Sequence, residues 1–416
     1  MIFHLYTLLY YLISGIFLPK DYFKRPPQLR KKWLKEKLAF FTKTDFISQR
    51  KVIWIHAVSV GEVVAISSLI KSLTKEYDIL LSTITDTGNQ VASQKFKDLP
   101  VKIIYLPLDC PFAIKRILKA FNPSALLIAE TEIWPNLILT SSKKIPVFLI
   151  NARISDKSFK RYKKIKFFLT PILKSFSLIA VQDEKYKERF KDLGAPEEKI
   201  IVTGNTKFDI EIPYISFLWE NSIPHPIIVA GSTHFPEEKL ITETFLKISI
   251  PSSLFIVPRH PERYKEVEKT ITSIMDEKSE VGFYKFSKLP LDIKGFSKVI
   301  ILVDQMGILG PLYRIADIAI IGGSFIPHGG QNPLEAIYWE KPVIFGPSME
   351  NFPFIKEFLE KNVCLQVKDE QLKDLLEDLL KNPDKRVELG KKAYQIFKQK
   401  TGATEKILNL LKTRLK

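Results

Sequence analysis

Three charged residues stand where β-rich segments of the sequence end: Glu62 in HAVSVGEVVA, Glu130 in AETEIWPN and Lys207 in GNTKFD. A glutamate in the first turn of a helix is stabilised as the anion by the helix dipole. A second carboxylate acts the other way, because like charges raise a carboxyl pKa toward the range of a general base. Glu130 and Glu132 could provide that second charge, so we predict a proton-abstracting Glu62. The alternatives are a helix-end acid and a simple ion pair between Lys207 and Asp209.

A second candidate site lies in GGSFIPHGGQNPLEA, residues 322–336. Asn332 suits a helix N-cap, Pro333 the first helical position and Glu335 the acid of a capping box. Glycines let backbone amides approach a ligand, and a helix N-terminus favours an anion. The glycines concerned are Gly322, Gly323, Gly329 and Gly330. The segment therefore predicts an anion-binding turn, with a well-capped helix after a glycine turn as the structural alternative.

VPRHPER places Arg259, His260 and Arg263 after another β-rich segment. Arginine can bind a phosphate through two parallel hydrogen bonds, so this cluster is a further candidate anion site. A surface salt-bridge cluster is the alternative. The two cysteines, Cys110 and Cys364, are far apart, and no CxxC, GxGxxG, GxxxxGK[ST] or DxD pattern occurs. The sequence thus indicates no metal site, no disulfide framework and no P-loop.

Short β-rich segments alternate with helical segments, which is typical of parallel strands joined by crossover helices. Seven precede residue 210: VIWIHAVS, DILLSTIT, KIIYLPL, SALLIAE, PVFLINA, SLIAVQ and IIVTGN. Seven follow residue 225: IIVAGS, LFIVPRH, VGFYKF, KVIILVD, IAIIGGS, PVIFGP and VCLQV. At 416 residues the chain also exceeds what one core usually serves. We predict two doubly wound α/β domains, with ligands beyond the carboxyl ends of the strands, where the candidate residues lie.

The net charge of +17 is concentrated in two segments. Residues 1–50 hold ten basic against three acidic residues, and residues 153–174 hold eight against one. Residues 1–19 carry no charged side chain, and as a helix they would extend about 28 Å, close to the hydrocarbon thickness of a bilayer. Basic residues follow this run and no cleavage site ends it, so we predict an uncleaved membrane anchor with the bulk of the protein in the cytoplasm. The alternative is a helix docked on the protein's own surface.

The second basic segment interleaves Lys and Arg with aromatic and aliphatic residues. As a helix it would attract anionic head groups and insert apolar side chains into a membrane surface. An ordinary amphipathic helix and a nucleic-acid-binding helix are the alternatives. Together with the apolar N-terminus, the pattern favours an anionic membrane surface as partner.

The order of these motifs resembles the 3-deoxy-D-manno-octulosonic acid (Kdo) transferases, GT-B glycosyltransferases that act on lipid A. The resemblance covers nearly the whole chain through HAVSVGEV, STITDTG, AETEIWPNL, INARISDKS, VTGNTKFD, AGSTH, PRHPER, a Met-Gly turn and GGSFIPHGGQNPLEA. It implies two Rossmann-like domains that face across a cleft. It also implies CMP-Kdo as donor, a lipid A precursor, lipid IVA, as acceptor, inversion at the transferred sugar, and no metal or other cofactor.

The resemblance assigns roles where the motifs match. Glu62 corresponds to the catalytic base, and Glu130 and Lys207 correspond to groups that assist the transition state. The segments that bind CMP-Kdo correspond to Pro258 and Arg259, to Met306, Gly307 and Ile308, and to Asn332, Pro333, Leu334 and Glu335. Glu335 is expected to hold ribose hydroxyls. Family members commonly have an acidic residue at the position of Ile308, so we expect this residue to act only through its backbone.

The corresponding domain boundaries are an anchor helix at 1–19, an acceptor-binding domain at 20–212, a linker at 213–225 and a donor-binding domain at 226–416 that includes the terminal helices. Two other hypotheses stay open. One is a GT-B enzyme that uses a UDP- or GDP-sugar, or an epimerase of that architecture. The other is a non-catalytic, basic module bound to membrane or nucleic acid, although no RNA-reading motif occurs, so we expect no nucleic acid partner. The sequence specifies no oligomeric state.

Overall fold

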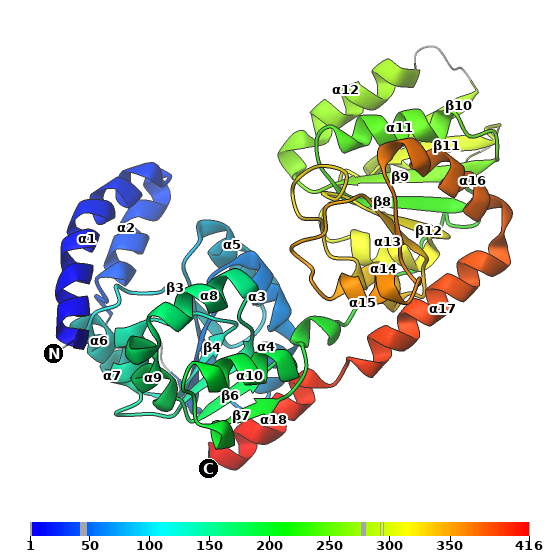
Figure 1. Ribbon diagram of the computed structural model, residues 1–416. Helices are drawn as coiled ribbons and strands as arrows, with labels where there is room; N and C mark the ends of the chain where they lie inside the picture. The colour runs from blue at the N-terminus through cyan, green and yellow to red at the C-terminus, as the bar shows by residue number, and fades with distance from the viewer. Residues whose placement is uncertain (1, 42–47, 276–279, 292, 294, 416) are drawn as a thin grey trace. The chain divides into compact units, whose positions relative to one another are not determined.

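The computed structural model describes residues 2–41, 48–275, 280–291, 293 and 295–415, and the chain forms two compact units (Figure 1). The first unit comprises Met1–Asp209 and Lys400–Lys416, and the second comprises Ile210–Gln399. Each unit contains one seven-stranded sheet, and the strands coincide with the fourteen predicted β-rich segments. The predicted pair of doubly wound α/β domains is therefore confirmed.

The sheet of the first unit is parallel, with the strand order β3-β2-β1-β4-β5-β6-β7. Its strands are β1 (Val52–His56), β2 (Asp78–Thr83), β3 (Val101–Tyr105), β4 (Pro123–Ala129), β5 (Val147–Ala152), β6 (Leu178–Val181) and β7 (Ile200–Val202). The strand order reverses between β1 and β4. Ligands of open parallel sheets bind at such a switch point, beyond the carboxyl ends of the strands.

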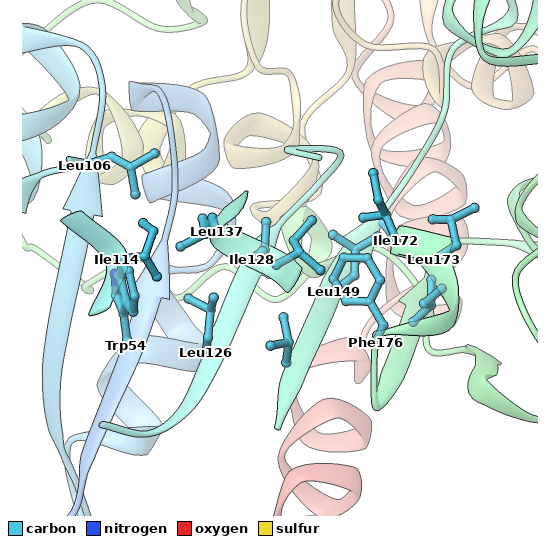
Figure 2. Close-up of a cluster of buried hydrophobic side chains, with 14 of the residues drawn as sticks. Trp54, Leu106, Ile114, Leu126, Ile128, Leu137, Leu149, Ile172, Leu173 and Phe176 are labelled. Carbon is cyan, nitrogen blue, oxygen red and sulfur yellow. The ribbon is translucent and has the colours of Figure 1, made fainter. Parts of the chain in front are cut away.

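Helices cover both faces of this sheet. One face packs against α6 (Pro111–Phe121), α7 (Pro135–Ser141), α9 (Lys166–Lys174) and α10 (Glu184–Asp192), and the other against α3 (Val60–Ala65), α4 (Ser67–Leu73), α5 (Asp86–Lys95) and α18 (Ala403–Arg414). Figure 2 shows the first of these cores, where Trp54 of β1 and Leu126 of β4 lie near Ile114 of α6. Because both faces are buried, the central strands β1 and β4 are predominantly apolar rather than alternating with polar residues.

The C-terminal helix α18 belongs to the first unit. Ile407 and Leu411 are buried in the core beneath α3, α4 and α5. The Asp209 carboxylate also accepts the backbone N–H of Gly402 at 2.6 Å. The prediction placed residues 226–416 in the second domain, and the structure differs for the last part of that range. The reason is that the apolar stripe of α18 completes a sheet face of the first unit, and a stripe by itself does not say which sheet it covers.

The sheet of the second unit has the order β10-β11-β9-β8-β12-β13-β14. Its strands are β8 (Ile227–Thr233), β9 (Ser252–Pro258), β10 (Val281–Lys285), β11 (Lys298–Leu302), β12 (Ile318–Ile321), β13 (Val343–Phe345) and β14 (Leu365–Gln366). Its helices are α11 (Glu237–Leu246), α12 (Tyr264–Met275), α13 (Leu309–Ile315), α14 (Leu334–Tyr338), α15 (Ile355–Glu360), α16 (Leu372–Lys381) and α17 (Pro383–Gln399). The switch point of this sheet lies between β8 and β12. It follows that both sheets have one site of the same topological kind.

The predicted linker at 213–225 packs on the second unit. The Phe217 ring stacks on Trp219, and the Trp219 ring stacks on Phe255 of β9. Arg314 of α13 donates a hydrogen bond from Nε to the carbonyl oxygen of Ile215 at 2.9 Å. This segment therefore contributes to the aromatic packing of the unit that follows it.

The N-terminal helix α1 (Ile2–Lys24) lies beside α2 (Pro27–Lys37) in the first unit (Figure 1). Within the described residues, α1 is the helix that is long and apolar enough to cross a membrane by length and composition. Tyr6 donates its hydroxyl hydrogen to Asp109 at 2.8 Å, and Phe3 lies against Phe168 of α9. The large apolar residues on the other side of α1 face outward, and Ile16 is 73% exposed.

Candidate functional site

Glu62 lies in the first turn of α3, directly after β1. Its carboxylate accepts the backbone N–H of Val58 at 2.7 Å and the hydroxyl of Ser59 at 3.3 Å. The pKa of Glu62 is raised to about 7, first by burial and then by the charges of Glu130 and Glu132, while the Val58 hydrogen bond acts against these effects. The effect of a second carboxylate expected from the sequence is therefore present, but burial is the larger cause.

Glu130 follows β4, on the other side of the switch point. Its backbone is left-handed, with φ of 54°, which costs a non-glycine residue about 1–3 kcal/mol. The buried carboxylate accepts a hydrogen bond from Arg153 Nε at 2.7 Å and pairs with Lys207 Nζ at 3.3 Å. Two cations thus pair with Glu130, while burial raises the pKa of the nearby Glu132.

Lys207 follows the edge strand β7, and its side chain extends from there to Glu130, which follows the central strand β4. The loop that carries it is held by Asn151, whose side-chain oxygen accepts the backbone N–H of Thr206 at 3.1 Å. Asn151 is buried and left-handed, with φ of 52°. The predicted grouping of Glu62, Glu130 and Lys207 is therefore present at one edge of one sheet.

Arg153 is a residue of this cluster that the sequence analysis did not assign to the site. Burial lowers the pKa of its guanidinium, but the Glu130 carboxylate raises it more, and Glu62 adds to that effect. The signal was present in INARISDKS, where a basic residue directly follows a β-rich segment. From the sequence, Arg153 belongs to the basic segment 153–174. In the structure its side chain instead turns back to the strand ends and pairs with Glu130.

The arrangement suits proton abstraction. A buried carboxylate with a pKa near neutrality can accept a proton from a substrate at physiological pH. Burial, and after it the neighbouring Glu130, raise that pKa, and both Arg153 and Lys207 pair with Glu130. The cluster therefore combines one carboxyl group of raised pKa with a second carboxyl group that pairs with two cations.

The glycine-rich segment of the second unit differs from its prediction. The Glu237 carboxylate of α11 accepts the backbone N–H groups of Gly323 at 2.7 Å, Ser324 at 3.0 Å and Phe325 at 2.9 Å. Gly329 donates its N–H to Ser348 at 2.8 Å, and the N–H groups of Gly322 and Gly330 bond to backbone carbonyls. These amides are thus already used within the protein. The glycines instead permit close packing and the left-handed turns at 323, 329 and 330.

The two arginines of PRHPER separate in the structure. Arg263 binds the Glu238 carboxylate with two hydrogen bonds, at 2.8 and 3.2 Å, and also pairs with Glu266. It is therefore the salt-bridge alternative. Arg259, at the end of β9, is half-buried, and its guanidinium has no carboxylate partner within the described part of the chain. Of the pair, Arg259 is the residue left to bind an anion.

Three histidines gather beside Arg259. The His234 ring lies 4.3 Å from that of His328 and 5.4 Å from that of His260, between centroids. The pKa of His234 is lowered to about 4, first by burial and then by its neighbours, which include Arg263 and Arg259. His234 is therefore neutral, and its Nε2 lies 3.0 Å from the Gln331 side-chain amide. No role was predicted from the sequence for His234 in AGSTH or for His328 in GGSFIPHGG.

The other donor-site candidates flank the same edge of the sheet. Met306 is 63% exposed, and Gly307 has φ of 79°. Asn332 accepts the N–H of Leu334 at 3.2 Å, but α14 begins at Leu334 with Pro333 as its N-cap, so the predicted cap at Asn332 is one residue too early. The Glu335 carboxylate lies beside Gly310 of α13. A side-chain Cβ atom at position 310 would be 3.6 Å from Glu335 Oε2. Pro258, Ile308 and Pro333 complete the predicted set. No group of three or more His, Cys, Asp or Glu suited to a metal ion occurs among the described residues.

Comparison with known proteins gives consistent matches. A model of the 3-deoxy-D-manno-octulosonic-acid transferase (kdotransferase) family matches residues 32–210. The 3-deoxy-D-manno-octulosonic acid transferase of Haemophilus influenzae is 38% identical over 87% of both chains, and that of Chlamydia trachomatis is 30% identical over 91% of this chain and 90% of its own.

Solved structures support the architecture. UDP-GlcNAc 2-epimerase from Neisseria meningitidis aligns with a TM-score of 0.55 at 16% identity, over 87% of this chain and 100% of its own. MurG from Acinetobacter baumannii aligns with a TM-score of 0.56 at 12% identity, over 88% of this chain and 99% of its own. At these identities the likeness concerns the GT-B-like fold alone.

Proposed function

Because this chain belongs to the Kdo transferase family, and is a glycosyltransferase of lipopolysaccharide biosynthesis, we propose that it transfers Kdo from CMP-Kdo to a lipid A precursor, lipid IVA, with Glu62 as general base. The observation that carries the proposal is the carboxylate of Glu62 at the switch point of the first sheet, with a pKa of about 7. A general base works best when its pKa is close to the working pH.

The reaction then proceeds as a single displacement. The Glu62 carboxylate takes the proton of an acceptor hydroxyl while that oxygen attacks the anomeric carbon of Kdo. A new carbon–oxygen bond forms as the bond between this carbon and the CMP phosphate oxygen breaks, and its electron pair leaves with CMP. Attack opposite to the leaving group inverts the anomeric configuration.

Glu130, Lys207 and Arg153 set the conditions for this step. Burial is the main cause of the raised pKa of Glu62, Glu130 adds to it, and Glu130 itself pairs with the two cations. When Glu62 gains a proton, the net negative charge of the cluster falls, which favours proton transfer to it. Lys207 and Arg153 also provide positive charge near the negative charge that develops on the acceptor oxygen.

The donor is assigned to the second unit. Arg259 would bind the phosphate of CMP-Kdo, beside the cluster of His234, His260 and His328. Met306, Gly307 and Ile308 would contact the nucleotide through an exposed turn, with Ile308 contributing its backbone. Asn332, Pro333 and Leu334 would shape the nucleotide pocket, and Glu335 would accept hydrogen bonds from the ribose hydroxyls.

The acceptor implies that the protein acts at a membrane, and we place it on the cytoplasmic face of the inner membrane. Both ends of the α1 segment support a helix that lies on the membrane rather than crosses it. Thr7 bonds to Asn136 at 3.0 Å, and Arg25 bonds to Asp86 at 3.1 Å, so both ends contact the same globular unit. The outward apolar side of α1 would enter the lipid, with the basic helix α8 (Asp156–Lys164) facing anionic head groups.

The test is a transfer assay on the full-length protein with freshly generated CMP-Kdo and a tetra-acylated lipid A precursor, with products resolved by mass spectrometry. We expect mass increments of one Kdo unit, and the number of increments counts the sugars added. A protein that binds CMP but forms no product with this acceptor would contradict the acceptor assignment. Calorimetry with CMP, UDP and GDP tests the donor, and a preference for UDP or GDP would contradict CMP-Kdo.

A further inference from the structure

A pocket of about 850 Å³ lies in the first unit between α6, α7 and the N-terminal end of α1. Its walls include Phe3, Leu118 and Leu139, which are half-buried against the hydrophobic core. Its volume falls in the range of pockets that hold ligands of drug-like size. None of the residues assigned above to the donor or to proton abstraction lines it.

The charge of this pocket is one-sided. Lys115, Lys119, Lys143 and Lys144 line it, and no aspartate or glutamate does. None of the four lysines has an ion-pair partner among the residues that the structure describes. Unpaired cations beside an apolar wall match a ligand that carries both a phosphate and hydrocarbon.

The lysines of the pocket lie away from the chemistry, while Pro111 and Asn136, at the starts of α6 and α7, line its other end. Helices α6 and α7 run from the carboxyl ends of the strands back to their amino ends, because each connects two parallel strands. Lys119 lies in the last turn of α6, and Lys143 and Lys144 lie just after α7. They are therefore about one helix length, roughly 15 Å, from the edge that holds Glu62 and Glu130.

We propose that this pocket binds an anionic membrane phospholipid, with its phosphate on the lysines and part of an acyl chain along the wall of Phe3, Leu118 and Leu139. The neighbouring α1, whose outer side is apolar, gives a lipid in the membrane surface a direct path into the pocket. Because the lysines lie far from Glu62, we infer that the occupant is a resident lipid that positions the protein at the membrane, and not the acceptor lipid itself. The proposal extends the membrane association proposed above, but its test uses no transfer activity, so the two can fail separately.

The test measures lipid retained by the detergent-purified, full-length protein by native mass spectrometry, after incubation with phosphatidylglycerol or phosphatidylcholine. We expect retention of phosphatidylglycerol over phosphatidylcholine. The variant Lys119→Glu/Lys143→Glu/Lys144→Glu should lose this retention by at least about tenfold, because each lysine near an anionic head group contributes measurably to binding. Equal retention in the variant and the wild type would overturn the proposal.

The matched control is Lys71→Glu/Lys75→Glu/Lys97→Glu, which makes the same charge change on exposed lysines at the opposite face of the sheet. It should retain phosphatidylglycerol like the wild type, and an equal loss there would mean that net charge alone decides binding. Inorganic phosphate should not displace the lipid at equal concentration. Displacement would show an anion site without a lipid.

A second measurement works on the unmodified chain if the triple variant does not fold. A photoactivatable phosphatidylglycerol, crosslinked in detergent, should label peptides of α6 and of the α7 end. Labelling confined to the exposed side of α1, or spread evenly over the protein, would contradict the proposal. Thr140→Trp fills the pocket without changing its charge, and it should reduce labelling of α6 and α7.

Discussion

The carboxyl edges of the two sheets share a topology but differ in charge. At the first edge, Glu62 has a pKa raised to about 7 and lies near Glu130, whose carboxyl group pairs with Lys207. At the second edge the acid is Glu237, and it is fully occupied by backbone amides, while Arg259 stays open. One fold therefore supplies a proton acceptor in one unit and an anion receptor in the other, and the difference lies in which charges the loops leave unsatisfied.

Replacing Glu62, the carboxyl group with the raised pKa, should have the largest effect. Glu62→Gln keeps the oxygen that accepts the Val58 N–H but cannot take a proton, so kcat for Kdo transfer should fall about 1,000-fold, within the usual contribution of a general base. CMP affinity, measured by calorimetry on the same preparation, should stay at the wild-type value. Near-normal turnover would remove Glu62 from the mechanism.

Removing Arg259, the cation of the second sheet edge without a carboxylate partner among the described residues, should have the next largest effect. Arg259→Ala should weaken CMP binding roughly 10- to 100-fold, the range expected for losing a hydrogen bond to a charged group. Arg263→Ala is the matched control from the same segment. It should cost about 3 kcal/mol of unfolding free energy, because it leaves the buried Glu238 unpaired, with CMP affinity of the folded protein retained. Loss of CMP binding in Arg263→Ala alone would reverse the assignment.

Removing one of the two cations that pair with Glu130 should have a smaller effect. Lys207→Met removes one of the two cations on Glu130, and we expect kcat to fall about tenfold, or about 1.4 kcal/mol of transition-state stabilisation. Lys199→Met, which removes only a hydrogen bond to a backbone carbonyl at the opposite end of β7, should leave kcat unchanged. Equal losses in both variants would point to general destabilisation.

The fold could be predicted from the sequence because both sheets are covered on two sides. Buried strands such as VIWIH have no polar alternation to confuse their assignment, and each lies between helical segments. The placement of α18 could not be predicted, because Ile407 and Leu411 indicate an apolar face without indicating the sheet that receives it. The strand order of the second sheet, with β11 between β9 and β10, was equally absent from the pattern.

The site was predictable where a residue's position in a strand-end loop determines its role. Glu62, Glu130 and Lys207 converge because parallel strands end at one edge. Side-chain partners were not predictable: Arg153 turns to Glu130, and Glu237 occupies the amides of the glycine turn. These contacts depend on backbone conformations, such as the left-handed Glu130, that local sequence preference argues against.

The raised pKa of Glu62 should also be visible in stability, as the smallest effect. Its folded pKa exceeds the ordinary value of 4.5, so the native state loses stability as pH rises from about 4.5 through 7. Glu62→Gln should therefore match the wild type below that window and be more stable above it, by roughly 1–3 kcal/mol at pH 8, since one pKa unit corresponds to about 1.4 kcal/mol. Chemical denaturation at pH 4.5 and pH 8 measures this difference, and equal stability at pH 8 would contradict the raised pKa.

The most direct test of a base tuned by its neighbours is the pH dependence of kcat/KM for Kdo transfer. The wild type should lose activity at acid pH with an apparent pKa of about 7. Arg153→Met should move that limb to higher pH, because it removes a positive charge that favours the ionised form of the cluster. A wild-type profile that stays flat through neutrality, or an Arg153→Met limb that does not move, would contradict the account.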